Sequence, residues 1–144
     1  MMTLRNLLDQ KGRLVYTVSP DIAVAEALTI MAGRNIGALV VVEDGHVIGL
    51  FSERDFARLA VQHPGAGLDQ PVRTMMTSPV LSVPPGRSVE ECMSLMTRHR
   101  IRHLPVCEDD SLLGVVSIGD LVKAVLDERN FVIRQLENYI TGVR

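Results

Sequence analysis

Aromatic residues are scarce in this sequence, whose 144 residues include no tryptophan, two tyrosines and three phenylalanines. The five rings are scattered along the chain and do not form the series that a base-stacking surface needs. The formal net charge of -2 provides no general attraction to the phosphate backbone of a nucleic acid. These two features argue against a nucleic-acid-binding module.

Cysteines and long apolar stretches are also few. The two cysteines, Cys92 and Cys107, lie within apolar patterns, which is typical of reduced thiols in a protein core. No apolar run approaches the roughly 18 residues that span a bilayer. Residues 1–13 also lack the basic segment and apolar stretch of a secretory signal. The sequence therefore predicts a cytoplasmic location and no membrane segment.

An internal repeat organises the chain. When position n is compared with position n+65 from Thr17 to Ala60, 13 of 44 pairs are identical. Unrelated sequences of this composition would give about three identities. Because the two copies align without a gap, the chain is a duplication of one supersecondary unit.

Each copy predicts the same order of elements. A β-type run, at 13–18 and 79–83, is followed by a proline and then by a helix with apolar residues at i, i+3, i+4 and i+7. Two further strands are joined by an acidic turn, and a second helix closes the unit. The strand pairs are expected at 37–43 and 46–52, and at 103–108 and 112–117, with closing helices at 53–62 and 118–128.

A unit of strand, helix, strand, strand and helix is too small to cover both faces of its sheet. We therefore expect an α/β fold in which two such units, related by pseudo-twofold symmetry, pack through their sheets. The stretch 63–71 is rich in proline and glycine and is interpreted as linker. The expected divisions are 9–68 for the first unit, 69–75 for a linker and short helix, 76–134 for the second unit, and 135–144 for a helix end and tail.

The C-terminal part carries more apolar residues than one packing face uses. The helix at 118–128 has them on more than one side, and a last amphipathic segment at 129–141 adds a further apolar face. Such a surface indicates another partner. We expect a homodimer, because cyclic twofold pairing is the commonest arrangement of identical chains.

Both copies contain the motif G-x-x-S-x-x-D, at 49–55 and 114–120, where a strand passes into a helix. A serine followed three residues later by an acidic residue is typical of a helix N-terminal cap. The first turn of a helix also favours a phosphate, and an aspartate can accept hydrogen bonds from a ribose diol. The two roles can coexist, and both remain open at this point.

These features resemble the tandem cystathionine β-synthase (CBS) domain pair. The likeness rests on the order of elements, on the repeated motif and on the RHLPV stretch at 102–106, and it covers about residue 9 to about residue 134. The resemblance implies a regulatory module, not an enzyme, which binds adenosine nucleotides in clefts between the two units. It implies that the motif aspartate binds the ribose, that the serine lies near the phosphates, and that backbone groups of the strands hold the adenine.

Carried onto this sequence, the resemblance implies the following nucleotide-binding residues: Thr17, Val18, Ile36, Gly37, Ala38, Ser52, Arg54, Asp55, Ser82, Val83, Arg102, His103, Leu104, Pro105, Ser117, Gly119 and Asp120.

The two implied clefts differ. Arg54 stands inside the first motif, where the second motif has Gly119, and Arg102 and His103 correspond to a glycine and an alanine at 37–38. We expect two unequal sites: a small, arginine-poor first cleft and a basic second cleft. The charges at 98 and 100 are interpreted as solvated surface groups.

The implied ligand is AMP, with ADP, ATP, NAD(H) and S-adenosylmethionine as alternatives. A pair of this kind without an effector domain would pass its signal to an unknown effector protein.

A small enzyme or metal-binding protein is the competing hypothesis. His99, His103 and Cys107 are spaced as metal ligands could be. A proline interrupts this series at 105, however, and the chain has no nucleophile elbow of the form G-x-S-x-G. The sequence therefore favours binding without catalysis and without a metal.

Overall fold

The computed structural model describes residues 1–62, 64–65 and 67–142. Parts of the predicted linker and tail, namely His63, Ala66, Val143 and Arg144, lie outside the described residues. Along the chain the elements are α1 (Leu4–Lys11), β1 (Thr17–Val18), α2 (Val24–Arg34), β2 (Ala38–Glu43), β3 (His46–Ser52), α3 (Glu53–Gln62), the 3₁₀ turn η1 (Val72–Thr74), α4 (Val89–His99), β4 (His103–Glu108), β5 (Ser111–Ser117) and α5 (Ile118–Thr141).

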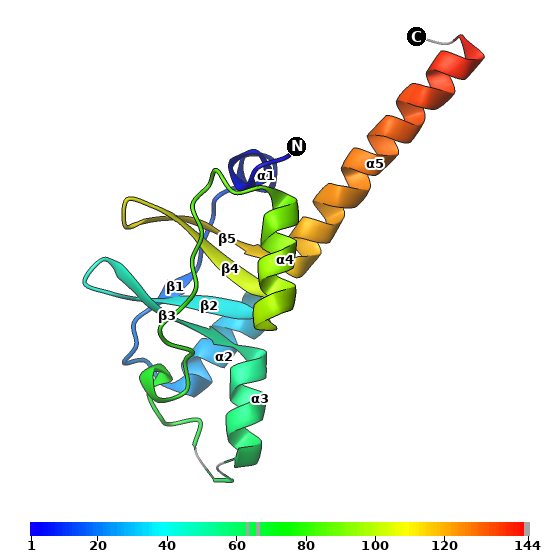
Figure 1. The fold of residues 1–144 in the computed structure, drawn as a ribbon. Helices are drawn as coiled ribbons and strands as arrows, with labels where there is room; N and C mark the ends of the chain where they lie inside the picture. The colour runs from blue at the N-terminus through cyan, green and yellow to red at the C-terminus, as the bar shows by residue number, and fades with distance from the viewer. Residues whose placement is uncertain (63, 66, 143–144) are drawn as a thin grey trace.

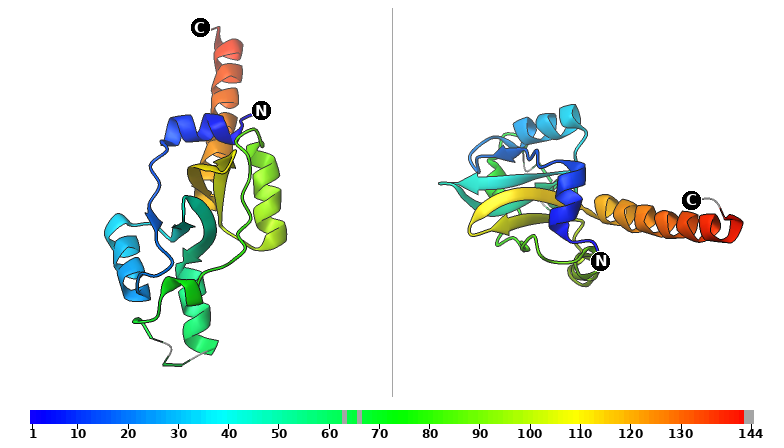
Figure 2. Two further views of the ribbon diagram at one scale, coloured as in Figure 1. Left: turned by 90° about the vertical axis from the view of Figure 1, so that its left-hand side faces the viewer. Right: turned by 90° about the horizontal axis from the view of Figure 1, so that it is seen from above.

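The strands form two sheets, one in each unit. In the first sheet β1 runs parallel to β2, and β2 pairs antiparallel with β3 in the order β1-β2-β3. In the second sheet β4 pairs antiparallel with β5. Figure 1 shows the β4–β5 hairpin directly above the first sheet, and Figure 2 shows the same stacking from the side. The predicted α/β architecture of two units packed through their sheets is confirmed.

The first strand of each unit is shorter than predicted. In the first unit only Thr17 and Val18 pair with β2. In the second unit the expected strand at 79–83 is reduced to an isolated parallel bridge between Val83 and Val106. Prolines at 79 and 84 lack the N–H that a longer ladder needs, so pairing extends little beyond that bridge.

Each unit has its own core, formed by one face of its sheet and the helices against it. The first core contains Val18, Val24, Ala27, Met31, Leu39, Val41, Phe51, Val72 and Met75. The second contains Leu4, Leu7, Leu8, Val83, Val89, Cys92, Met96, Leu104, Val106, Val116, Leu121 and Ala124. Val40 and Leu50 alternate with the core residues and are nevertheless buried, because the opposite face of the first sheet is covered by the second sheet.

Helix α1, which the sequence analysis did not predict, belongs to the core of the second unit. Its three leucines are buried there, and a capping box between Thr3 and Asn6 starts the helix. The backbone amide of Leu4 donates to the Arg87 carbonyl at 2.9 Å. A Cβ built on Gly114 would lie only 2.7 Å from Leu8 Cδ2, so glycine at this position allows the helix to pack closely on β5.

The segment around η1 packs against the first unit in the same way that α1 packs against the second unit. The Val72 amide donates to the Ile22 carbonyl at 2.9 Å, and residue 22 corresponds to residue 87 in the 65-residue repeat. The ion pairs follow the same correspondence, since Arg73 contacts Glu43 and Arg5 contacts Glu108. The segment that precedes the first unit therefore packs on the second unit, and the segment that precedes the second unit packs on the first. The residues of these two segments correspond at a spacing of 68, so that residue 4 matches residue 72.

Helix α5 is one continuous helix of 24 residues. The amphipathic segment predicted at 129–141 is helical and continues the helix predicted at 118–128 without a break, because residues 120–141 contain neither glycine nor proline to end the helix before Gly142. Only its first part is buried, through Leu121 and Ala124, and the remainder projects away from the body (Figures 1 and 2). Among the described residues, none of the helices has the length and apolarity that a bilayer crossing requires.

Candidate functional site

The first Ser-x-x-Asp motif lies where β3 passes into α3. The Ser52 amide and hydroxyl donate to Asp55 Oδ2 at 2.9 and 3.0 Å, and the Asp55 amide donates to Ser52 Oγ at 3.2 Å. The Thr77 hydroxyl donates to Oδ1 of the same carboxylate at 2.9 Å. These bonds form a helix cap, so the capping interpretation is confirmed. Each carboxylate oxygen can accept about two hydrogen bonds, and the Thr77 bond therefore leaves Oδ1 able to accept another.

The second motif has the same capping box, formed by Ser117 and Asp120, but a different third partner. Lys11 Nζ donates to Asp120 Oδ2 at 2.6 Å and to the Val115 carbonyl at 2.7 Å. Partial burial raises the pKa of the Asp120 carboxyl, but the hydrogen bonds from Lys11 and Ser117 outweigh it, and the net pKa lies below the ordinary value. A cation thus neutralises Asp120, whereas Asp55 faces a neutral hydroxyl.

A pocket of about 630 Å³ opens beside Asp55 and is lined by both units. The first unit contributes its motif and α3, and the second contributes the segment from the end of α4 to the start of β4. This volume is in the range of small-molecule sites. The lining residues are Gly37, Leu50, Ser52, Glu53, Arg54, Asp55, Arg58, Thr77, Pro79, Val80, Leu81, His99, Arg100, Ile101, Arg102 and His103.

The pocket at Asp55 is basic. Four arginines, at 54, 58, 100 and 102, and two carboxylates, at 53 and 55, line it, which leaves two positive charges without counting histidine. The prediction of an arginine-poor first cleft is therefore wrong. Arg100 is exposed, as a solvated charge would be, and its backbone carbonyl accepts a hydrogen bond from Arg54. The sheets stack so that the start of β4 meets the end of β3, and this brings the second unit's basic residues to the first unit's motif.

Arg54 and His103 lie at the junction between the two units. Arg54 donates to the Arg100 carbonyl at 2.8 Å, which joins α3 to the end of α4. A Cβ added to Gly37 would lie 3.5 Å from the His103 ring, in ordinary contact with it, so the residue that corresponds to Arg102 lies directly beside this ring. Burial lowers the pKa of His103, although the charge of Asp120 opposes the shift. This shift favours the neutral form of the ring.

The remaining predicted residues lie outside this pocket. Val18, Val83 and Leu104 have buried side chains in the two cores, and Ile36 packs against the first core. In the sheets, Ala38 pairs with Ser52, Pro105 pairs with Val115 and accepts a hydrogen bond from the Val83 amide, and Ser82 is a hydrogen-bond partner of the Cys107 thiol. Gly119 is not forced by packing, because a Cβ there would be 3.6 Å from Ser117 Oγ.

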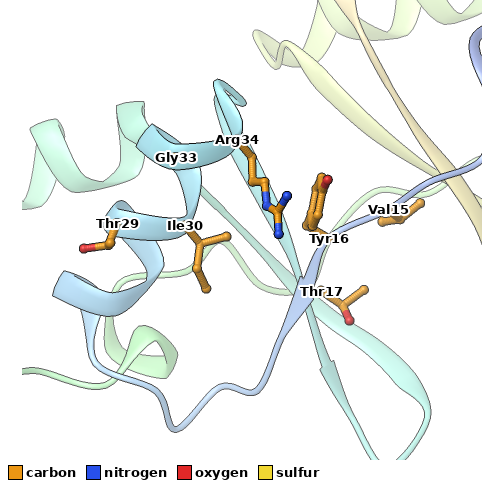
Figure 3. Close-up of a pocket in the computed structure, with 7 residues that line it drawn as sticks. All are labelled: Val15, Tyr16, Thr17, Thr29, Ile30, Gly33 and Arg34. Atoms are coloured by element: carbon orange, nitrogen blue, oxygen red, sulfur yellow. The ribbon is translucent and has the colours of Figure 1, made fainter.

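Thr17 lies in a separate hollow of about 640 Å³ between β1 and α2. Figure 3 shows Tyr16 and Arg34 facing one another across it, and the Arg34 guanidinium lies 5.0 Å from the centre of the Tyr16 ring. This cation–π contact joins the end of α2 to the residue that precedes β1. Among the described residues, the hollow and the pocket at Asp55 have no lining residue in common.

Several pocket residues were not predicted from the sequence as nucleotide ligands. His99 and Arg100 end helix α4, Arg58 follows Arg54 by one turn of α3, and Thr77 comes from the segment after η1. The i, i+4 spacing of the two arginines on one helix face was a signal that sequence reasoning could have used. Thr77 gave no such signal, because its neighbour Asp55 is 22 residues away.

The competing metal site receives no support from the side-chain positions. Within the part of the chain that the structure describes, no three His, Cys, Asp or Glu side chains come together as metal ligands. Instead, His103 and His99 line the basic pocket, and Cys107 contacts Ser82.

Comparison with known proteins agrees with this architecture. The sequence model of the CBS domain matches residues 13–62 and 72–127. A mitochondrial CBS domain-containing protein of Arabidopsis thaliana, CBSX3, is 34% identical over 149 residues, covering 97% of this chain and 72% of that protein. The crystal structure of a CBS-domain containing protein from Agrobacterium tumefaciens is 41% identical with a TM-score of 0.82, covering 85% of this chain and 98% of that one.

A more distant structure has the same fold with ligands bound. The CBS domain pair of protein MJ0100, solved in complex with 5'-methylthioadenosine and S-adenosyl-L-methionine, superposes with a TM-score of 0.78 at 21% identity, covering 89% of this chain and 98% of that one. The duplicated unit, the repeated motif and the matches over both halves lead to one conclusion: this chain belongs to the CBS domain family and contains two CBS units in tandem.

Proposed function

We propose that this chain is a regulatory module that binds an adenosine nucleotide, AMP by preference, in the pocket at Asp55. The observation that carries the proposal is the combination, in one pocket, of a motif carboxylate with four arginines. The carboxylate would accept a hydrogen bond from a ribose hydroxyl, and the guanidinium groups would bind the phosphate. The ligands of the MJ0100 pair, both adenosine derivatives, support the choice of nucleoside.

The charge of the pocket favours a monophosphate. Its two uncompensated positive charges, four arginines less two carboxylates, match the charge of roughly -2 that a phosphate monoester carries near neutral pH. Uncharged adenosine would leave the arginines without a partner. The roughly four negative charges of ATP would exceed the net positive charge of the pocket. ADP, ATP, NAD(H) and S-adenosylmethionine are the alternatives to compare.

Regulation would follow from the position of the pocket between the units. A ligand that contacts both units changes their relative arrangement to the extent that it binds one arrangement more tightly. An effector protein that contacts both units would detect this change. The module itself would perform no catalysis.

Calorimetric titration of the wild-type chain tests the proposal. We expect AMP to bind at least about tenfold more tightly than adenosine, because charge-assisted hydrogen bonds to a phosphate contribute about 1.5–3 kcal/mol. The advantage of AMP should shrink as salt is raised. Native mass spectrometry of the protein as purified would show which nucleotide it retains. Equal affinities for adenosine and AMP, or tighter binding of S-adenosylmethionine than of AMP, would contradict the phosphate assignment.

A second nucleotide site at Asp120 is expected to be weaker because Lys11 already occupies its carboxylate. The variant Lys11→Met removes the cation that bonds Asp120 Oδ2. Both partners are partly exposed, at 39% and 25%, so the competing contact is worth only about 1 kcal/mol. We expect AMP affinity at this second site to rise about fivefold, seen as an increase in stoichiometry during titration.

The matched control is Arg13→Met, which breaks an exposed ion pair with Asp9 in the same part of the chain. This variant should titrate as the wild type does. If Lys11→Met leaves the stoichiometry unchanged or weakens binding, Lys11 does not compete for the Asp120 site.

A further inference from the structure

The projecting part of α5 has an exposed apolar seam with the spacing of a coiled coil. Leu126, Ile133 and Ile140 recur every seven residues and occupy the a positions of a heptad. Val122, Arg129 and Leu136 occupy the d positions, so that the seam runs through residues 122, 126, 129, 133, 136 and 140. Leu126, Ile133, Leu136 and Ile140 are 50%, 46%, 58% and 81% exposed.

This length of helix is poorly supported within one chain. Only Leu121 and Ala124 of α5 are buried, and residues 126–142 are all exposed. The seam from 122 to 140 is about 27 Å long at 1.5 Å per residue. A helix of this length that packs on nothing is marginal in water, so burial of the seam against a partner would stabilise it.

We propose that the occupant of this seam is the α5 helix of a second copy, paired antiparallel about a twofold axis near residue 131. In this register Val122 packs on the partner's Ile140, and Leu126 packs on the partner's Leu136. Each chain then extends its helix along the first turns of the other's α5. The pairing rests on α5 alone and does not depend on the nucleotide pocket.

The charges on the seam select the antiparallel direction. A parallel pair would place Arg129 against the same residue of the other chain in one core layer, and like charges there repel. The antiparallel pair places Arg129 opposite Ile133, where its aliphatic stem can pack while the guanidinium reaches water.

The flanking positions agree with this direction. In an antiparallel pair the e positions of the two helices face each other, which brings Lys123 beside the partner's Glu137 on both sides of the axis. At the centre Asn130 faces its own counterpart. A parallel pair would separate Lys123 and Glu137 by 14 residues, about 21 Å, and would have no such ion pairs.

Single-cysteine cross-linking distinguishes the two directions. Cys92 is buried, and burial raises the pKa of its thiol to about 11, so Cys107→Ser gives a background with little thiol reactivity. In this background Val132→Cys, near the axis, should form a disulfide-linked dimer on oxidation. Val122→Cys and Ile140→Cys should not link when oxidised separately, because each lies about 27 Å from its own copy, but an equal mixture of them should.

Sedimentation equilibrium measures the association itself. Wild type is expected to be dimeric, and Leu136→Glu should raise the dimer dissociation constant at least about 100-fold, because it places a charge in a buried core layer. The matched control is Asn138→Glu, which adds the same charge at an exposed position outside the seam. Both variants should keep the helical circular dichroism of the body and the AMP titration of the wild type.

Three results would overturn the proposal. Efficient self-linking of Val122→Cys would show a parallel pair. Absence of any cross-link in Val132→Cys would show that no second copy occupies the seam. Equal dissociation constants for wild type and Leu136→Glu would show that association, if present, uses another surface.

Discussion

Replacing Asp55 by alanine is expected to weaken AMP binding about 100-fold in a calorimetric titration. The carboxylate lies in the basic pocket, and among the described residues Oδ1 accepts a hydrogen bond only from the Thr77 hydroxyl. If Oδ1 also accepts a ribose hydroxyl, its loss removes a hydrogen bond to a charged group, which is worth up to about 3 kcal/mol and so covers a change of about 100-fold. No arginine in the pocket can replace it, because a guanidinium has no acceptor.

The interpretation requires a control for the helix cap that Asp55 also forms. Loss of such a cap lowers the free energy of unfolding by about 1 kcal/mol. Asp120→Ala removes an equivalent cap from the second unit and should leave tight AMP binding within about twofold of wild type. Asp55→Asn keeps a side-chain oxygen for capping and should still lose most of the affinity. If Asp55→Ala binds AMP as wild type does, or if Asp120→Ala loses as much, the ribose does not bind at Asp55.

Replacing Leu8 by alanine is expected to lower the free energy of unfolding by about 3 kcal/mol. Leu8 is 1% exposed and packs directly on the backbone of β5 at Gly114. A buried leucine replaced by alanine loses its apolar contacts and leaves a cavity, which costs about 2–5 kcal/mol. The corresponding fall in Tm is about 6–12 °C for a chain of this size. Urea unfolding followed by circular dichroism would measure the change.

The same substitution at Leu14 is the matched control. Leu14 is 78% exposed, so Leu14→Ala should change the free energy of unfolding by less than about 0.5 kcal/mol. Equal stabilities of the two variants would mean that α1 contributes little to the second core. If Leu8→Ala instead shows a second, low-urea transition, α1 separates from the body before the core unfolds.

Much of the fold could be predicted from the sequence, because the pattern of each helix and hairpin occurs in both copies of the repeat. The helix at 53–62 and the strands at 46–52 and 103–108 have the predicted bounds, since their apolar period and turn residues are local properties. Helix α1 was missed although Leu4, Leu7 and Leu8 have helical spacing. The segments around α1 and η1 share few identical residues, so the repeat did not reveal them. Each also packs on the unit that does not directly follow it in the sequence: α1 packs on the second unit, and the η1 segment packs on the first.

The candidate site divides in the same way. The serines and aspartates of the two motifs could be found from the sequence, because the repeat keeps them while the residues between them change. The sequence could not show which basic residues lie beside each motif, because Arg102 and Asp55 are brought together only when the sheets stack. The contact between Lys11 and Asp120, 109 residues apart in the chain, left no local pattern either.

The sequence by itself determined that this protein is a duplicated unit with a Ser-x-x-Asp motif between a strand and a helix in each half, since hydrophobic period and turn residues act over a few neighbouring residues. Only the tertiary structure decided that the surroundings of the two motifs differ. Packing of the second sheet on the first gathers four arginines at Asp55, and packing of α1 on the second unit gives Asp120 a lysine. Contacts of that range depend on how whole elements fit together, and no local property of the chain specifies them.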